Sequence, residues 1–175
     1  MNSTSDLSLK TNLHGVFLNI FDKGILLTGK SGVGKSECAL ALLDRGHQLI
    51  CDDAPIFERR HNQLFGTAPL ALLHLLEVRG LGIINVQHVF GRGCTLQEQA
   101  LDLVLELAVP PTSELRSDNK KLFYKQISGV SILHLSISVM LKSQMAILVE
   151  TAVKLAFSSE NTVIKNAQAS LDISS

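Results

Sequence analysis

Residues 29–36 carry glycine, lysine and serine at a spacing that suits phosphate binding. The segment reads Gly29-Lys30-Ser31-Gly32-Val33-Gly34-Lys35-Ser36 and matches the pattern G-x-x-x-x-G-K-[ST] in full. Its glycines let backbone N–H groups curl around phosphate oxygens, and a helix that follows adds the positive end of its dipole. Lys35 is expected to bridge the β- and γ-phosphates and the Ser36 hydroxyl to bind magnesium. The pattern predicts a nucleoside-triphosphate site at all eight residues but leaves the phosphate acceptor open.

A strand, a helix and a second strand must hold this loop. Val16–Ile20 and residues 24–28 are short apolar runs around a polar turn, which predicts a strand pair. The apolar spacing after Glu37 predicts a helix that stops at Gly46, followed by a strand at Gln48–Cys51. Strand, glycine loop, helix and strand form a unit that is right-handed and parallel by default.

Two adjacent carboxylates, Asp52 and Asp53, follow the second strand. If Gln48–Cys51 neighbours residues 24–28, both carboxylates emerge beside the phosphates, because parallel strands end at the same sheet edge. There they could hold magnesium or accept a proton from an attacking hydroxyl. For an isolated Asp-Asp pair, a simple turn after the strand would be the preferred interpretation. Alternation along a strand predicts that the two side chains point in different directions and have different roles.

The rest of the chain predicts one α/β domain over residues 1–175, a P-loop nucleotide-binding fold with a mixed, partly parallel sheet. Residues 1–13 are expected to be a loose lead-in and residues 159–175 a frayed tail. A hairpin is predicted near residues 55–65, a helix over 69–78 ended by Gly80 and Gly82, and strands over 83–86 and 130–140. Residues 101–108 fit a strand or a helix. Ser143 is expected to cap a helix whose inward face is Met145, Leu148, Val149, Ala152 and Val153.

Composition excludes several classes of protein. With 46% apolar and 18% charged residues the chain is not disordered by composition. Its formal net charge of zero argues against a nucleic-acid binder. Three scattered cysteines without a Cys-x-x-Cys pair suggest neither a disulfide framework nor a zinc site. The sequence shows no signal peptide and no membrane-spanning run, so a cytoplasmic protein without a membrane partner is expected.

The sequence resembles the HPr kinase/phosphorylases, bacterial enzymes that phosphorylate a serine of the sugar-transport carrier HPr or of its paralogue. The resemblance rests on His14-Gly15, the phosphate loop, Arg45-Gly46-His47, Asp52-Asp53 and Gly66-Thr67-Ala68-Pro69. It is most specific in the run Leu76-Glu77-Val78-Arg79-Gly80-Leu81-Gly82-Ile83-Ile84-Asn85-Val86, which looks like the family signature. The match covers a little over half the chain and is thin beyond Phe90.

The resemblance implies roles that the residues alone do not reveal. Lys35 matches the phosphate-binding lysine, Ser36 and Glu77 match magnesium ligands, and Asp53 matches the proton acceptor of the kinase direction. His14 and Arg116 match a further histidine and arginine of the active site. By themselves, His14 would be a surface residue before a strand and Glu77 the polar face of a helix end. The resemblance also implies ATP and Mg²⁺ as cofactors, a reverse reaction of inorganic phosphate that releases pyrophosphate, and a hexamer.

Three departures from the family pattern leave alternatives open. Family members of full length carry an N-terminal domain, so a short form with only the catalytic domain is expected here. Lys30 replaces an aspartate found in many members. Residues 138–144 lack both arginines of a family loop resembling P-V-R-P-G-R-N. The alternatives are another P-loop kinase acting on a small molecule, and a nucleotide-binding regulatory module with little catalysis.

Overall fold

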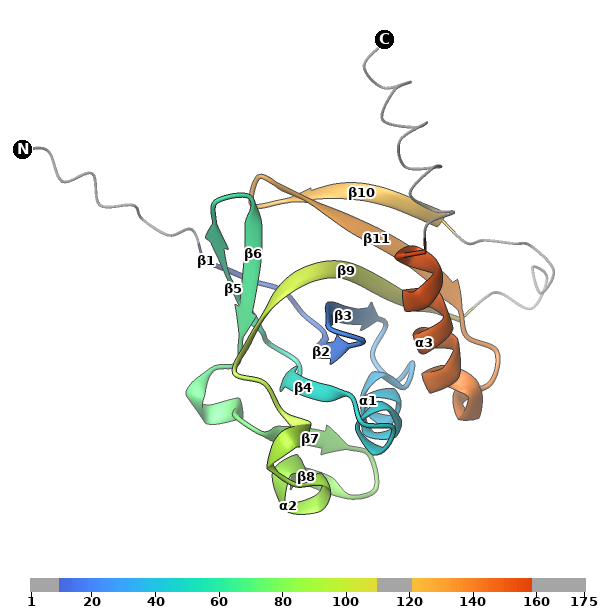
Figure 1. The fold of residues 1–175 in the computed structure, drawn as a ribbon. Helices are drawn as coiled ribbons and strands as arrows, with labels where there is room; N and C mark the ends of the chain where they lie inside the picture. Colours follow the sequence, from blue (N-terminus) through green and yellow to red (C-terminus); the bar gives the residue numbers. More distant parts are fainter. Residues whose placement is uncertain (1–9, 110–120, 159–175) are drawn as a thin grey trace, which may run out of the picture.

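Strand β9 (Glu98–Ala108) organises the sheet in the computed structural model, which describes residues 10–109 and 121–158. Its first residues pair with β6 (Gln63–Thr67), and its remainder lies parallel to β3 (Lys23–Gly29) and β11 (Val130–Ser138). The strand order is β1-β5-β6-β9-β3-β2-β4, with β10 (Lys121–Ile127) paired to β11 (Figure 1). The other strands of this order are β1 (Lys10–Asn12), β5 (Ile56–Arg60), β2 (Val16–Ile20) and β4 (Gln48–Cys51). The predicted P-loop-type α/β fold with a mixed, partly parallel sheet is confirmed.

The two faces of the sheet are buried in different ways. Helices α1 (Lys35–Asp44) and α3 (Met145–Ala156) cover one face, where they pack on inward side chains such as Ile25, Leu27 and Leu103. The other face is filled by the β5–β6 hairpin, and its buried side chains include Phe17, Leu26, Phe57 and Leu64. Successive side chains of β2 and β3 point to opposite faces of the sheet, so these strands contribute residues to both clusters.

The strand that ends in Asp52-Asp53 does not neighbour the strand before the phosphate loop. Strand β2 lies between them and is antiparallel to both β3 and β4. Because β3 and β4 each oppose β2, they still run in the same direction and end at the same edge. The expected adjacency is wrong, but its consequence for the carboxylates holds.

The helix expected over residues 69–78 is wrong. A 3₁₀ turn at Leu70–Leu72 leads into strand β7 (Leu75–Val78), which forms a hairpin with β8 (Gly82–Asn85). His74 has a φ of 62°, a value that a continuous helix over 69–78 does not allow, and Gly80, with a φ of 88°, lies in the turn between β7 and β8. Leucines at positions 72, 73, 75 and 76 fit a helix by spacing, yet Leu76 and Val78 are buried and Glu77 between them is exposed.

The other predictions of secondary structure are confirmed in part. The structure confirms the strand pair over residues 16–28 and the hairpin near residues 55–65. It also confirms the helix after Glu37 and the strand over 130–140, and residues 101–108 form a strand. The lead-in contains β1, which pairs with β5. Gln144, not Ser143, precedes α3, and no side-chain hydrogen bond caps this helix. Of its expected inward face, Leu148 is exposed while the other four residues are buried.

Three shorter elements complete the described chain. They are α2 (Val86–Phe90) and the 3₁₀ turns Arg92–Cys94 and Lys142–Gln144. Within residues 10–109 and 121–158, no helix is long and apolar enough to cross a membrane. Arg116 and the tail from residue 159 lie outside the described residues.

A buried carboxylate joins the two main helices. Glu150 of α3, whose side chain is 9% exposed, accepts hydrogen bonds from Arg45 Nε at 2.8 Å and Arg45 Nη2 at 2.5 Å. His47 Nε2 lies 2.8 Å from the same carboxylate. The hydrogen bond from Arg45 lowers the pKa of Glu150 from its usual value to about 2, against the opposing effect of burial. Arg45 and His47 directly follow α1, so this cluster fixes α3 against the helix that follows the phosphate loop.

Glu150→Gln should lower the free energy of unfolding at pH 7 by about 2–3 kcal/mol, because Arg45 and His47 lose their charged partner. Since folding depresses the Glu150 pKa, its contribution is present above pH 4.5 and is lost as the pH falls towards 2. Urea unfolding at several pH values measures both effects. Glu98→Gln, which removes a surface partner of Arg60, is the control and should cost under about 1 kcal/mol. An equal loss of unfolding free energy in Glu150→Gln and Glu98→Gln would contradict the stabilising role assigned to Glu150.

Candidate active site

The phosphate loop joins the end of β3 to the start of α1. Gly29 has a φ of 138°, and a Cβ there would lie 2.5 Å from the Leu107 carbonyl oxygen of β9. Gly34, the residue before α1, has a φ of 108°. Both positions need glycine, because other residues rarely adopt these angles. The loop is thus held between the central strand of the sheet and the positive end of a helix, the arrangement that favours phosphate.

Lys35 rests on the backbone of its own loop. Its Nζ donates to the carbonyl oxygens of Gly29 at 2.9 Å and of Lys30 at 3.3 Å. These neutral acceptors are weak partners for an ammonium group compared with a charged phosphate oxygen. The loop is therefore folded in a form that leaves Lys35 able to exchange carbonyl oxygens for phosphate.

Asp53 and His14 form a pair at the same edge. Asp53 has a φ of 69°, a left-handed conformation that turns the chain sharply after β4. Its carbonyl accepts a hydrogen bond from Gly15 N at 3.0 Å, which fixes the start of β2 beside it. As a result, His14 Nδ1 lies 3.0 Å from Asp53 Oδ1, and both side chains are largely exposed, at 72% and 68%. An exposed carboxylate oriented by a histidine can accept a proton from an incoming hydroxyl.

Asp52 has a different partner from Asp53, as predicted, but the left-handed turn at Asp53 separates them rather than alternation along a strand, because β4 ends at Cys51. Asp52 Oδ2 accepts a hydrogen bond from Glu77 N of β7 at 2.9 Å. Burial raises the pKa of Asp52, the hydrogen bond from Glu77 N opposes this rise, and the charges of Asp53 and Glu77 add to it. Asp52 thus fastens the β7–β8 hairpin to the end of β4, while Asp53 remains free to face the solvent.

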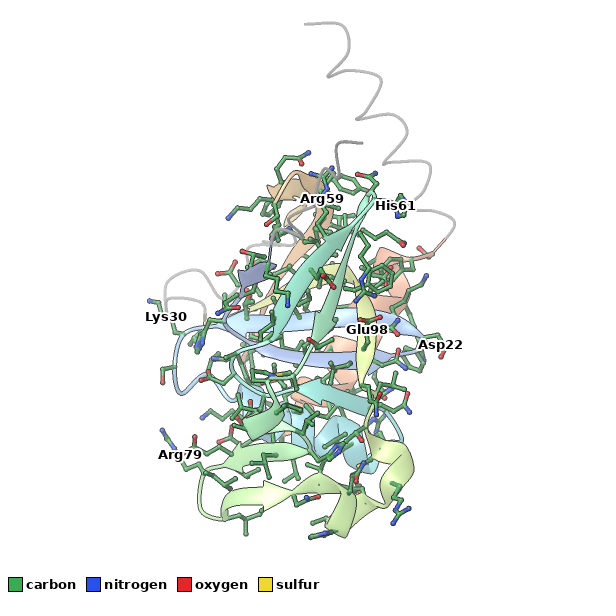
Figure 2. All side chains as sticks on the ribbon, turned by 90° about the vertical axis from the view of Figure 1, so that its left-hand side faces the viewer. Asp22, Lys30, Arg59, His61, Arg79 and Glu98 are labelled. Atoms are coloured by element: carbon green, nitrogen blue, oxygen red, sulfur yellow. The ribbon has the colours of Figure 1, made fainter. Side chains whose placement is uncertain are left out.

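Glu77 and Arg79 reach the site from the β7–β8 hairpin. Glu77 faces away from the core because Leu76 and Val78 on either side of it are buried. Arg79 projects from the hairpin turn on the same side of the molecule as Lys30 of the phosphate loop (Figure 2). Arg79 lines the cavity and adds positive charge there.

These groups surround one open cavity of about 360 Å³. Its lining combines loop residues, four carboxylates, three basic side chains and one apolar side chain: Ser31, Gly32, Gly34, Ser36, Glu37, Asp52, Asp53, Glu77, Lys35, His14, Arg79 and Val16. Of the expected phosphate-loop residues, Gly29, Lys30 and Val33 are not in the lining, and Val33 is buried in the core. The structure brings together His14, Lys35, Ser36, Asp53 and Glu77. Arg116, the remaining expected site residue, lies outside the described part of the chain.

The oxygen ligands present fit a magnesium ion that arrives with a triphosphate. Within the described residues no group of three or more His, Cys, Asp or Glu could hold a metal ion by itself. Magnesium bound to nucleotide phosphates usually takes only one or two protein carboxylates and keeps several waters. The hydroxyl of Ser36 and the carboxylate of Glu77, both lining the cavity, supply hard oxygen donors of this kind.

A second hollow of about 730 Å³ adjoins the first, and His14 lines both. Its lining includes the sheet residues Leu26 and Val104 and the stacked pair Phe123–His134, whose ring centroids are 5.3 Å apart. It also contains the charged side chains Glu106 and Lys125. The Asp53–His14 pair therefore lies where the cavity at the phosphate loop meets a wider, partly apolar hollow.

Comparisons with known proteins agree on one family. An "HPr kinase/phosphorylase" of Lactobacillus delbrueckii subsp. bulgaricus is 39% identical over 152 residues, covering 84% of this chain and 47% of the relative. One of Xylella fastidiosa is 40% identical over 154 residues, covering 85% and 49%. The chain thus spans about half the length of the curated relatives it matches.

A solved structure supports the same relationship. The structure titled "Structure of the Hpr(Ser) kinase/phosphatase from Coxiella burnetii" superposes with a TM-score of 0.75 at 31% identity, covering 90% of this chain and 99% of that one. The sequence model of the HPr Serine kinase C-terminal domain matches residues 5–172. The chain therefore belongs to the HPr Serine kinase C-terminal domain family.

Proposed function

We propose that this chain transfers the γ-phosphate of ATP to a serine hydroxyl of an HPr-like carrier protein. The observation that carries the proposal is the meeting of the phosphate loop with the Asp53–His14 pair in one cavity. The loop and Lys35 suit a nucleoside triphosphate, and the exposed carboxylate suits a hydroxyl acceptor. The names of the relatives support the carrier HPr as the acceptor. The wider hollow that His14 also lines offers further surface for an acceptor beside the phosphate-loop cavity.

In the forward step, the serine Oγ attacks the γ-phosphorus while the bond to the bridging oxygen of ADP breaks. Asp53 takes the hydroxyl proton, and His14 keeps the Asp53 carboxylate turned towards the acceptor. Lys35 exchanges the loop carbonyls for phosphate oxygens, and the backbone N–H groups of the loop stabilise the charge that develops on them. In the reverse step, an oxygen of inorganic phosphate attacks the phosphorus of the phosphoserine and the bond from phosphorus to serine Oγ breaks. Asp53 gives its proton to Oγ, and the pyrophosphate formed is released.

Magnesium would be held by the Ser36 hydroxyl and the Glu77 carboxylate, where it supplies positive charge to the phosphates. Asp52, by its hydrogen bond to Glu77 N, would keep Glu77 at the cavity. A hexameric assembly and a cytoplasmic location are part of the proposal and rest on the family alone.

The direct test uses the purified chain with HPr or its nitrogen-system paralogue, magnesium, and labelled ATP or pyrophosphate. The proposal expects label on a serine of one carrier and none on a Ser→Ala carrier. Label on a metabolite instead would favour the small-molecule kinase. Nucleotide binding without any transfer would favour the regulatory module.

Lys35→Ala should reduce transfer by at least about 10²-fold, because charge developing on the phosphates loses its main cation. The fold should stay intact, since the side chain contacts only loop carbonyls. Transfer and circular dichroism are measured on the same preparation, with Lys10→Ala on the exposed strand β1 as control. Full activity in Lys35→Ala would show that residues 29–36 are not the phosphate-binding site.

Asp53→Asn should lower the transfer rate by roughly 10²–10⁴-fold, the usual contribution of a general base, with little change in ATP affinity. Asp52→Asn should be milder, because its oxygen serves the Glu77 backbone rather than the acceptor. Single-turnover rates and nucleotide titrations separate the chemical step from binding. If Asp52→Asn were the more damaging change, the two roles would have to be exchanged.

The forward reaction should outpace phosphorolysis of the phosphoserine carrier. Phosphorolysis places inorganic phosphate beside a phosphorylated protein, and two close anions favour the fork-shaped guanidinium of arginine. Residues 138–144 contain no arginine and a single lysine, Lys142. Pyrophosphate release from phosphoserine carrier is compared with the forward rate on one preparation. Equal rates would show that this segment does not limit the reverse reaction.

A further inference from the structure

A second lysine contacts the phosphate loop from a distant part of the chain. Lys142 Nζ donates to the Gly32 carbonyl oxygen at 3.1 Å, across 110 positions of sequence. Lys142 opens the 3₁₀ turn Lys142–Gln144 that leads into α3, and its side chain is exposed. Gly32 belongs to the lining of the phosphate cavity, so the ammonium group lies at the rim of that cavity.

The segment that carries Lys142 is fixed at both ends. Before it, Val139 is buried and its N–H donates to the Ala108 carbonyl of β9 at 2.7 Å. After it, Met145 is 1% exposed, and its Cε would lie 3.1 Å from a Cβ placed on Gly34. Further along α3, Glu150 is bound to Arg45 at the end of α1. The backbone at position 142 is therefore held against the loop, and only the flexible side chain is free to move.

Lys142 and Lys35 are in equivalent situations. Each ammonium group rests on carbonyl oxygens of the same loop, Lys35 on Gly29 and Lys30 and Lys142 on Gly32. A neutral carbonyl at the surface is a weak partner for a cation, whereas a terminal phosphate offers several charged oxygens. A cation delivered to the terminal phosphate from outside the loop is also the way in which other P-loop enzymes stabilise the transferring group.

We propose that Lys142 acts in cis as a phosphate-binding lysine, leaving the Gly32 carbonyl to bind the terminal phosphate of ATP or pyrophosphate. It joins Lys35 at the terminal phosphate and neutralises charge on the phosphoryl group that moves. This role rests on the proposed phosphate transfer, but its binding part is independent of the acceptor. Lys142 would be a catalytic residue contributed by the last helix segment rather than by the loop itself.

Two substitutions separate this role from a structural brace. Lys142→Gln keeps an N–H donor for the Gly32 carbonyl and removes the charge, while Lys142→Arg keeps both. Lys154→Gln is the matched control, because it makes the same charge change on α3 at a side chain that lies over the Phe21 ring, 4.7 Å from its centroid. Circular dichroism and thermal unfolding are measured for all three variants.

Binding of a non-hydrolysable ATP analogue, of pyrophosphate and of ADP is titrated with magnesium present. In Lys142→Gln we expect the analogue and pyrophosphate to bind about tenfold more weakly, with ADP changed by less than about threefold. Lys142→Arg and Lys154→Gln should bind like the unchanged chain. Equal weakening of all three ligands, or wild-type binding in Lys142→Gln, would overturn the proposal.

Transfer assays then test the catalytic part. A loss of kcat in Lys142→Gln, larger than the loss in Lys154→Gln, is expected if the lysine stabilises the moving phosphoryl group. If the unchanged chain binds ATP but phosphorylates no carrier, the proposed function fails, while the nucleotide titrations still decide the role of Lys142.

Discussion

The site depends on one topological constraint, the insertion of an antiparallel strand between two parallel ones. Because β2 opposes both β3 and β4, it begins at the edge where they end. The phosphate loop after β3, the carboxylates after β4 and the residues before β2 therefore meet there. The hydrogen bond from Gly15 N to the Asp53 carbonyl closes this arrangement and places His14 against the Asp53 carboxylate. A simple parallel neighbour would have brought the carboxylates to the loop but no histidine.

The carboxylates at this edge differ in their exposure and in their hydrogen-bond partners. Asp52, the more buried aspartate, is held by a backbone N–H that opposes the effects of burial and of neighbouring carboxylates on its pKa. Asp53 and Glu77 stay exposed, where water screens their repulsion. The lysines of the cavity rim meanwhile occupy carbonyl oxygens rather than these carboxylates. This separation leaves both the base and the cations available to a phosphorylated ligand.

Local patterns in the sequence predicted the local parts of the site and failed at the non-local ones. The phosphate loop and its helix follow from spacing over a few residues. The divergence of Asp52 and Asp53 was predicted from strand alternation, but the left-handed turn at Asp53 after the end of β4 produces it. Leucines at 72, 73, 75 and 76 have helical spacing although the segment is not a helix, so the helix predicted over 69–78 was wrong. The backbone of His74 and the glycine turn form a hairpin instead. That error also hid Arg79, which lines the cavity from the turn. Neither the position of β2 nor the Lys142–Gly32 contact leaves a pattern in nearby residues.

The last helix connects the stability of the core to the geometry of the phosphate loop. Glu150 of α3 binds Arg45 and His47, which follow the end of α1. Five residues earlier in α3, Met145 packs against Gly34 at the start of α1. Helices α1 and α3 are thus fixed to each other at both ends of α1. A shift of α3 would move Met145 and Lys142 relative to the loop, whereas the carboxylates of β4 and β7 would keep their positions in the sheet and its hairpin. The phosphate side of the site is therefore controlled by helix packing, and the acceptor side by strand order.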